Sequence, residues 1–207
     1  VRYNINLNQG DSIDVAAYAF SGSRFYPELE LYDSKGNFVA AGDTKLSGAT
    51  FEFKAFNSGA YYLLIDDRND RSTGQLKLTS VQVPGAQQDA DAGVLKSGQT
   101  VDRNLAAGDS DIYTFEALYG DSIDIATHAY SGAYFYPVVK VYGPEGALLV
   151  TGERDNNGNT CEFTVNRSGT HYLLIRDNDA RNGGDYRMTM VQAPGLQQDA
   201  DAGVLKS

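Results

Sequence analysis

The chain has 207 residues and a formal net charge of −10, from 17 lysines and arginines against 27 aspartates and glutamates. This acidity argues against a nucleic-acid partner and against an anionic membrane surface, because both are bound through clustered cations. No apolar run reaches the roughly 20 residues that span a bilayer, so membrane insertion is not expected. The 22 glycines and 14 tyrosines, without tryptophan, favour an all-β chain with many turns.

The sequence repeats itself after 110 residues. GDSID at 10–14 returns at 120–124, and PGAQQDADAGVLKS at 84–97 returns at 194–207 with one change. Residues 1–97 align with 111–207 without a gap, which predicts equal loop lengths and a shared backbone. A period of this length suits an independent domain rather than a solenoid unit.

Short strand-like stretches fill each repeat. Apolar and polar residues alternate from Cys161 to Val165, as in a strand with one buried face. Gly, Asn, Asp and Pro cluster between the stretches, which is typical of tight turns. In chain order, the strands expected in the linker and the second repeat are 94–96, 100–105, 112–117, 122–129, 136–142, 147–151, 160–165, 170–176 and 186–192.

Seven or eight short strands in about 100 residues predict an antiparallel β-sandwich. We therefore expect two tandem sandwiches, the first at 1–88 without its opening strands and the second at 89–198. Residues 199–207 would start a further repeat or supply a strand for exchange. An open sheet edge in the first repeat would allow self-association by such strand exchange. Alternatively, 89–97 closes the repeat that precedes it.

Five segments of the second repeat carry a family pattern. They are GVLKSGQT at 93–100, LAAGDSDIYTFEA at 105–117, VYGPEG at 141–146, SGTHYL at 168–173 and GDYRM at 184–188. In order and spacing they resemble the bacterial pre-peptidase C-terminal domain, to which the collagen-binding domains of clostridial collagenases are similar. The resemblance implies a jelly-roll-like, non-catalytic sandwich carried by secreted hydrolases or by arrays on extracellular proteins. Some relatives bind collagen or polysaccharide.

Residues that could perform catalysis are few. His128 and His171 replace tyrosines of the first repeat, and the single cysteine, Cys161, replaces Phe51 on an alternating strand. Packing explains these positions better than proton transfer or nucleophilic attack. No nucleophile elbow, HExxH motif or phosphate-binding loop is present. We therefore expect no enzyme activity.

Two acidic clusters flank the opening hairpin of the second repeat, Asp89 with Asp91 and Asp109 with Asp111. Hard cations prefer carboxylate, amide and carbonyl oxygens, so Ca²⁺ is the expected ion. The resemblance implies the same choice, because the collagenase modules bind calcium at the corresponding linker. The alternative is a solubilising acidic linker with aspartates in turns. A further acidic loop at 177–185 is expected to be an ordinary surface hairpin loop.

Tyrosines offer a flat apolar face with a polar tip, which suits contact with collagen or sugar rings. Tyr134 is the candidate ligand-binding residue, because its counterpart is Arg24 and neither side chain suits a core. The expected function is a non-catalytic accessory or binding module of a secreted or cell-surface bacterial protein. It would attach to a matrix protein or polymeric substrate, or space other domains, with an extracellular protein or polysaccharide as partner. The alternatives are a pair of carbohydrate-binding modules and a purely structural stalk repeat.

Overall fold

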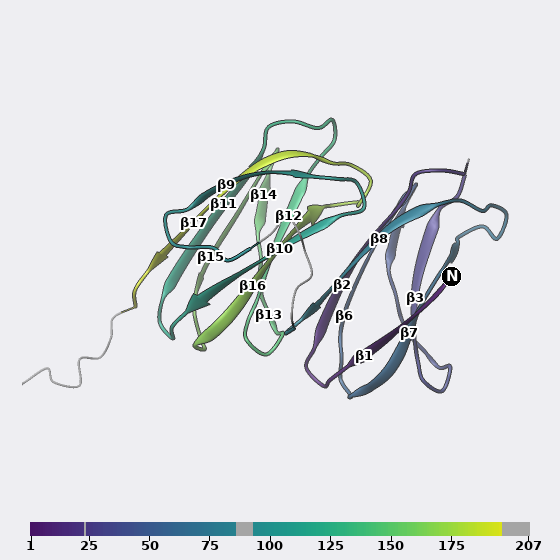
Figure 1. The fold of residues 1–207 in the computed structure, drawn as a ribbon, viewed down its shortest axis with the longest axis horizontal. Helices are drawn as coiled ribbons and strands as arrows, with labels where there is room; N and C mark the ends of the chain where they lie inside the picture. Colours follow the sequence, from purple (N-terminus) through teal and green to yellow (C-terminus); the bar gives the residue numbers. More distant parts are fainter. Residues whose placement is uncertain (23, 86–92, 196–207) are drawn as a thin grey trace, which may run out of the picture.

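The structure is a computed structural model that describes residues 1–22, 24–85 and 93–195. These residues form 17 strands in four sheets, which confirms the all-β prediction. They contain no helix, and so none that could cross a membrane. Figure 1 shows the four sheets as successive layers, two from each repeat.

The first repeat folds as a sandwich of two antiparallel four-stranded sheets, with the orders β1-β7-β3-β4 and β5-β6-β2-β8. Alternate apolar residues fill the space between them, among them Val15, Leu31 and Leu63. The strands are β1 (Arg2–Leu7), β2 (Ser12–Ala19), β3 (Pro27–Asp33), β4 (Phe38–Ala41), β5 (Asp43–Lys45), β6 (Gly48–Lys54), β7 (Gly59–Asp67) and β8 (Leu76–Val83).

The second repeat has the same topology with one strand added. Its sheets have the orders β10-β16-β12-β13 and β14-β15-β11-β17-β9, and Ile125, Val141 and Leu173 lie in the core between them. The strands are β9 (Thr100–Leu105), β10 (Ser110–Ala117), β11 (Ser122–Ala129), β12 (Pro137–Tyr142), β13 (Leu148–Thr151), β14 (Glu153–Asp155), β15 (Gly158–Thr164), β16 (Gly169–Asp177) and β17 (Gly184–Ala193).

The added strand, β9, pairs with β17 at the edge of its sheet. In the described part of the first repeat, β8 pairs only with β2, so the corresponding edge carries no strand there. The strand proposed for exchange, 199–207, and the boundary at 88/89 lie outside the described residues. Strand exchange therefore stays a prediction.

Most expected strands of the second repeat are confirmed to within one or two residues at each end. The exception is β14, which the prediction omits because all its residues are polar and exposed. The expected strand at 94–96 is reduced to a single parallel bridge between Val94 and Thr114. This bridge places Val94 beside β10, and Leu95 lies in the core of the second sandwich, so these two residues belong to the second sandwich.

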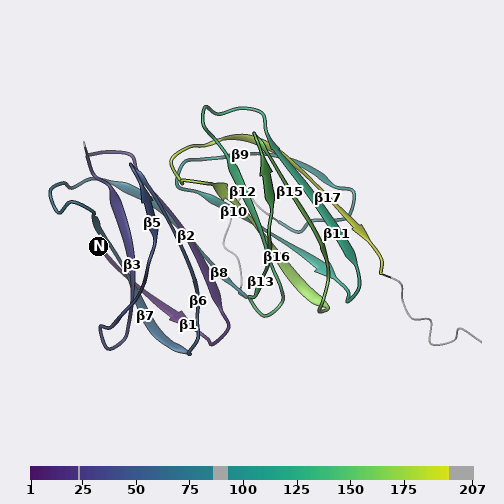
Figure 2. The same cartoon turned by 180° about the vertical axis from the view of Figure 1, so that it is seen from behind.

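Equivalent strands of the two repeats differ in how many faces they bury. In β11 buried and exposed residues alternate strictly, as expected for a sheet with one face in water. In β2, at the same place in the first repeat, nearly every residue is buried. The second covered face of β2 lies against the sheet of β10, β16 and β12, and the two sheets are adjacent in both views (Figures 1 and 2). The repeats therefore pack against each other, sheet face on sheet face.

Candidate functional site

The contact between the two sandwiches begins with an apolar cluster. Val81 and Val83 of β8 pack against side chains of the second repeat, and all members of the cluster are buried. The members from the second repeat are Ile112, Tyr142, Tyr172 and Leu174. Each member points away from its own sandwich core, because core residues occupy the alternate positions of these strands. Contact between the two sandwiches therefore buries apolar faces that each sandwich alone would expose to water.

Four charged side chains cross the same interface. The Asp14 carboxylate of the first sandwich accepts hydrogen bonds from Lys140 Nζ at 2.8 Å and from Arg176 Nε at 3.0 Å, both in the second. Glu52 Oε1 accepts from Arg176 Nη2 at 2.8 Å and also pairs with Lys140. Two carboxylates from one repeat thus meet two cations from the other, and the formal charge of the group is zero.

The group is deeply buried at its centre and open at one side. The side chain of Asp14 is 1% exposed and those of Lys140 and Arg176 are 4% exposed, whereas Glu52 is 44% exposed. Burial alone would raise the pKa of Glu52, but the hydrogen bond and charge of Lys140, followed by Arg176, outweigh it and hold that pKa below its usual value. Burial would lower the pKa of Arg176, and the charges of Asp14 and Glu52 raise it instead. Glu52 and Arg176 therefore remain ionised at neutral pH.

A buried charge group of this kind fixes geometry more than it adds net stability. Desolvation offsets much of the Coulomb attraction, but removing one partner leaves an uncompensated buried charge, which costs roughly 3–5 kcal/mol. Sliding the sheets past one another would separate Asp14 from Lys140 and Arg176 and incur the same penalty. The group therefore specifies one register between the two sandwiches.

Loops close the interface at its rim. Asp179 pairs with Lys45 of the first sandwich at 3.0 Å, and its carbonyl oxygen lies so near Gly48 that a Cβ there would be 2.0 Å from it. Only glycine allows that approach. The acidic loop at 177–185, expected as a surface loop, is thus also a contact between repeats. Inside the loop, the Asp177 carboxylate accepts backbone N–H groups of Tyr136 and Arg181.

The sequence alone left these interface residues unidentified. One signal could have found them, since two carboxylates of the first repeat are replaced by cations at the equivalent positions of the second. Lys140 stands where the first repeat has Glu30, and Arg176 stands where it has Asp66. Long cations in the middle of strands, where the sister copy has carboxylates, indicate a face that has changed partner.

The predicted calcium ligands are only partly within the described residues, because Asp89 and Asp91 lie outside them. The Asp109 carboxylate bonds to Lys77 Nζ at 2.5 Å and to the Thr79 hydroxyl at 3.0 Å, both on β8. The Asp111 carboxylate, buried in the second sandwich, accepts the Tyr186 hydroxyl at 2.5 Å.

The structure thus brings Asp109 and Asp111 to different partners. Burial, followed by the charge of Asp111, raises the pKa of Tyr186, so Tyr186 stays protonated and donates to Asp111. No group of three or more Asp, Glu, His or Cys side chains suited to a metal occurs in the part of the chain that the structure describes. The calcium site stays a prediction.

Tyr134 is exposed, at 73%, in the loop between β11 and β12. Its φ is +63° and that of its counterpart Arg24 is +69°, so both repeats hold a non-glycine residue in the left-handed region here. Tyr130, in the same loop, is 54% exposed. The loop therefore presents two tyrosines to solvent.

Of the three residues weighed for catalysis, His171 and Cys161 are packing residues, whereas His128 is exposed on the outward face of β11, so packing does not explain its position. His171 is fully buried and stacks on Phe115 with ring centroids 5.3 Å apart, and its Nδ1 bonds to the Gly169 carbonyl. Burial lowers its pKa, which favours the neutral ring. Burial likewise raises the pKa of the Cys161 thiol to about 12, far from a reactive thiolate.

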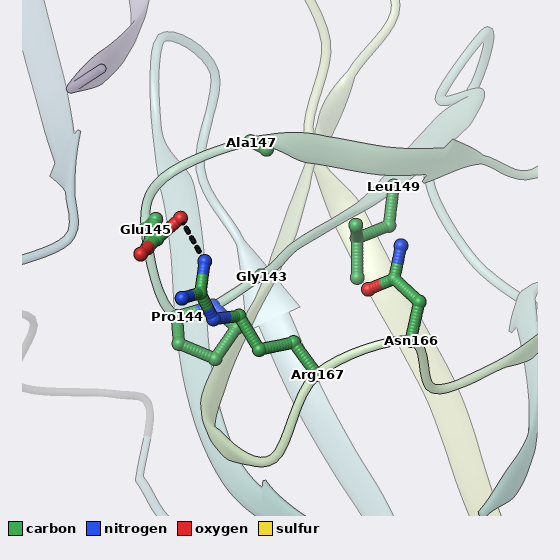
Figure 3. Close-up of a pocket in the computed structure, with 7 residues that line it drawn as sticks. All are labelled: Gly143, Pro144, Glu145, Ala147, Leu149, Asn166 and Arg167. Atoms are coloured by element: carbon green, nitrogen blue, oxygen red, sulfur yellow. Dashed lines mark ion pairs between the residues drawn. The ribbon is translucent and has the colours of Figure 1, made fainter. Parts of the chain in front are cut away.

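One open pocket lies at the end of the second sandwich (Figure 3). Gly143, Pro144, Glu145, Ala147, Leu149, Asn166 and Arg167 line it. Glu145 and Arg167 form an ion pair across it, and both side chains are more than half exposed. An exposed pair of this kind contributes little free energy, roughly 0–1 kcal/mol. The pocket offers two charges already paired with each other, rather than a positioned acid and base.

Comparisons with known proteins concern the fold. No protein-family model and no curated protein matches the sequence. Among solved structures, the pre-peptidase C-terminal domain of a collagenase from Bacillus anthracis aligns at 20% identity and a TM-score of 0.43, over 51% of this chain and 99% of that one. The family that the sequence motifs resemble is therefore found again among the structural matches, over about the length of one sandwich.

Two further matches have other names. PliG of Salmonella Typhimurium, a periplasmic inhibitor of g-type lysozyme, aligns at 16% identity and a TM-score of 0.38, over 51% of this chain and all of its own. An uncharacterised protein from Burkholderia cenocepacia aligns over 93% of this chain and 76% of its own, at 9% identity and a TM-score of 0.28. Such low identities carry no function, because sandwiches of this kind serve many.

The calcium prediction can be tested without disturbing the interface. Because Asp109 and Asp111 hold structural hydrogen bonds, the informative variant is Asp89→Asn/Asp91→Asn. Bound Ca²⁺ should stabilise the unchanged chain by about 2.7 kcal/mol at a hundredfold excess over the dissociation constant, and this gain should vanish in the variant. Thermal unfolding with Ca²⁺ or chelator measures this gain in stability.

The control is Asp43→Asn/Asp70→Asn, which removes two exposed carboxylates elsewhere. Equal melting temperatures of the unchanged chain in Ca²⁺ and chelator leave the acidic-linker interpretation.

Proposed function

We propose that this chain is a non-catalytic accessory segment of a secreted or cell-surface protein, in which two sandwiches act as one rigid spacer. The observation that carries the proposal is the buried charge group that joins Asp14 and Glu52 to Lys140 and Arg176. A flexible pair of modules would not need it. The sequence resemblance to pre-peptidase C-terminal domains supports the location outside the cell.

Rigidity follows from the kind of contact. Contacts between domains of one chain are commonly polar and permit relative motion. Here a cluster of buried aromatic and aliphatic side chains, including Tyr142 and Tyr172, flanks a charge group with a single favourable register. The ion pairs Lys45–Asp179 and Lys77–Asp109 add two further contacts between the sandwiches, outside the buried charge group. Such a unit holds whatever is attached to its ends at a fixed separation and orientation.

Attachment is a second candidate function, favoured by the exposed tyrosines of one loop. Tyr130 and Tyr134 extend from the second sandwich with no role in its core. Nearby, the guanidinium of Arg154 lies 5.0 Å from the ring centroid of Tyr136. Aromatic side chains held by an ordered loop bind polymers at a small entropic cost. Collagen or another extracellular protein, or a polysaccharide, is the class of partner that this loop would contact.

The spacer function predicts the result of reversing the acidic side of the interface. Asp14→Lys/Glu52→Lys would place four cations together, so the sandwiches should separate. Small-angle X-ray scattering should then show a larger radius of gyration and maximum dimension than for the unchanged chain. Glu153→Lys/Asp155→Lys reverses two exposed carboxylates of the edge strand β14 in the second repeat and should leave the profile unchanged. A flexible unchanged chain, or no difference between the variants, contradicts a rigid spacer.

The attachment function predicts a specific role for Tyr134. If the chain binds fibrillar collagen or a member of a polysaccharide array, Tyr134→Ala should weaken that binding by about tenfold, as at an aromatic hot spot. Tyr119→Ala removes a tyrosine that is 75% exposed in another loop and should have no effect. Equal losses in both variants, or no binding to any of these polymers, count against attachment and leave the spacer function.

A further inference from the structure

The outer face of the second sandwich repeats the face through which the first sandwich receives its neighbour. We call a face of this kind an acceptor face. In the first repeat it contains Ser12, Asp14, Glu52, Thr79 and Val81. At the equivalent positions the sheet of β11, β15 and β17 carries the same residue types. They are Ser122, Asp124, Glu162, Thr189 and Val191.

The same side chains are covered in one repeat and open in the other. Val81 is 5% exposed and Val191 is 48% exposed, although they occupy equivalent positions. Asp14 is bound by two cations, whereas no cation among the described residues forms an ion pair with Asp124 or Glu162. β9 extends this sheet at its edge and leaves the face open. In Figure 1 this sheet forms one outer layer of the stack.

We propose that the outer face of β11, β15 and β17 is a docking surface for a further β-sandwich of this repeat type. The docked sandwich presents a lysine and an arginine to Asp124 and Glu162, as the second repeat presents Lys140 and Arg176 to the first. Charge complementarity and continuity with the existing interface define the occupant. Since the contact joins two different faces, its repetition builds an open stack rather than a closed dimer.

The first sandwich of another copy of this chain does not meet the requirement. At the positions of Lys140 and Arg176 it carries Glu30 and Asp66, so its outer face would bring carboxylates against Asp124 and Glu162. Like charges placed together at an interface suppress binding of the wrong partner. The reversal thus excludes head-to-tail growth of the unmodified chain and selects a neighbour with the basic pair.

The sequence beyond the second sandwich agrees with this choice. Residues 84–97 lead from the first sandwich to its docked neighbour, and residues 194–207 repeat them with a single difference, Ala86 against Leu196. The same linking sequence therefore follows both acceptor faces. The inference depends on the interface alone and is independent of the spacer function proposed above.

The test uses two full-length chains that each offer one half of the contact. The unchanged chain carries the acceptor face. The donor chain is the variant Arg2→Ile/Glu30→Lys/Asp66→Arg/Asp124→Asn/Glu162→Gln. It gains the basic pair on its first sandwich, with isoleucine at the position equivalent to Ile112, and it loses the charges of the acceptor face on its second. Each chain alone should be monomeric in sedimentation velocity. Mixed, they should form a 1:1 complex that weakens as salt rises.

The matched control replaces the acceptor by Asp124→Asn/Glu162→Gln, which keeps the shape and removes the charges. Its affinity for the donor should fall by more than about tenfold, as for a desolvated charge pair. Circular dichroism checks that every chain is folded, and a milder donor, Glu30→Lys/Asp66→Arg/Asp124→Asn/Glu162→Gln, replaces the first if it is not. No complex between folded chains, equal binding by the control, or oligomers of the unchanged chain alone overturns the proposal.

Discussion

The architecture depends on one carboxylate. Asp14 is placed on the outward face of a central strand, where water would normally solvate it, yet its side chain is 1% exposed. It is tolerated there only because Lys140 and Arg176 reach it from the other repeat. Separating the sandwiches would return these charges to water one by one, while any shifted packing would leave them buried and unpaired. Every other contact between the repeats is compatible with the register that this group selects.

The two repeats show how one backbone serves two positions in a stack. Core positions keep their apolar residues, so Val15 and Ile125 do the same work in each sandwich. Outward positions diverge on the face of β10, β16 and β12 that meets the first sandwich, whereas the outward face of β11, β15 and β17 keeps the residue types of its counterpart. The reversal from Glu30 and Asp66 to Lys140 and Arg176 changes no strand, but it decides which face can be covered. Order in the stack is therefore encoded in a few outward charges rather than in the fold.

Much of the fold could be predicted from the sequence, because alternation and turn residues are local signals. The strand containing Cys161 and Phe163 has a clear period of two, and the structure confirms it as β15. The interface could not be predicted in the same way, since period-two patterns identify an outward face without showing what covers it. Asp14 and Asp124 both end the sequence GDSID, yet one is buried at the interface and the other is exposed. Only the tertiary arrangement distinguishes them.

The most direct test of this account is the unfolding of the full chain by urea, followed at both sandwiches. We expect one transition, and Lys140→Met should lower the free energy of unfolding by roughly 3–5 kcal/mol or split the transition in two, since Asp14 loses a partner. Arg187→Met, which breaks the exposed pair with Asp102, should change it by less than about 1 kcal/mol. Two independent transitions in the unchanged chain, or equal effects of the two substitutions, would contradict the claim that the buried charge group joins the sandwiches into one unit.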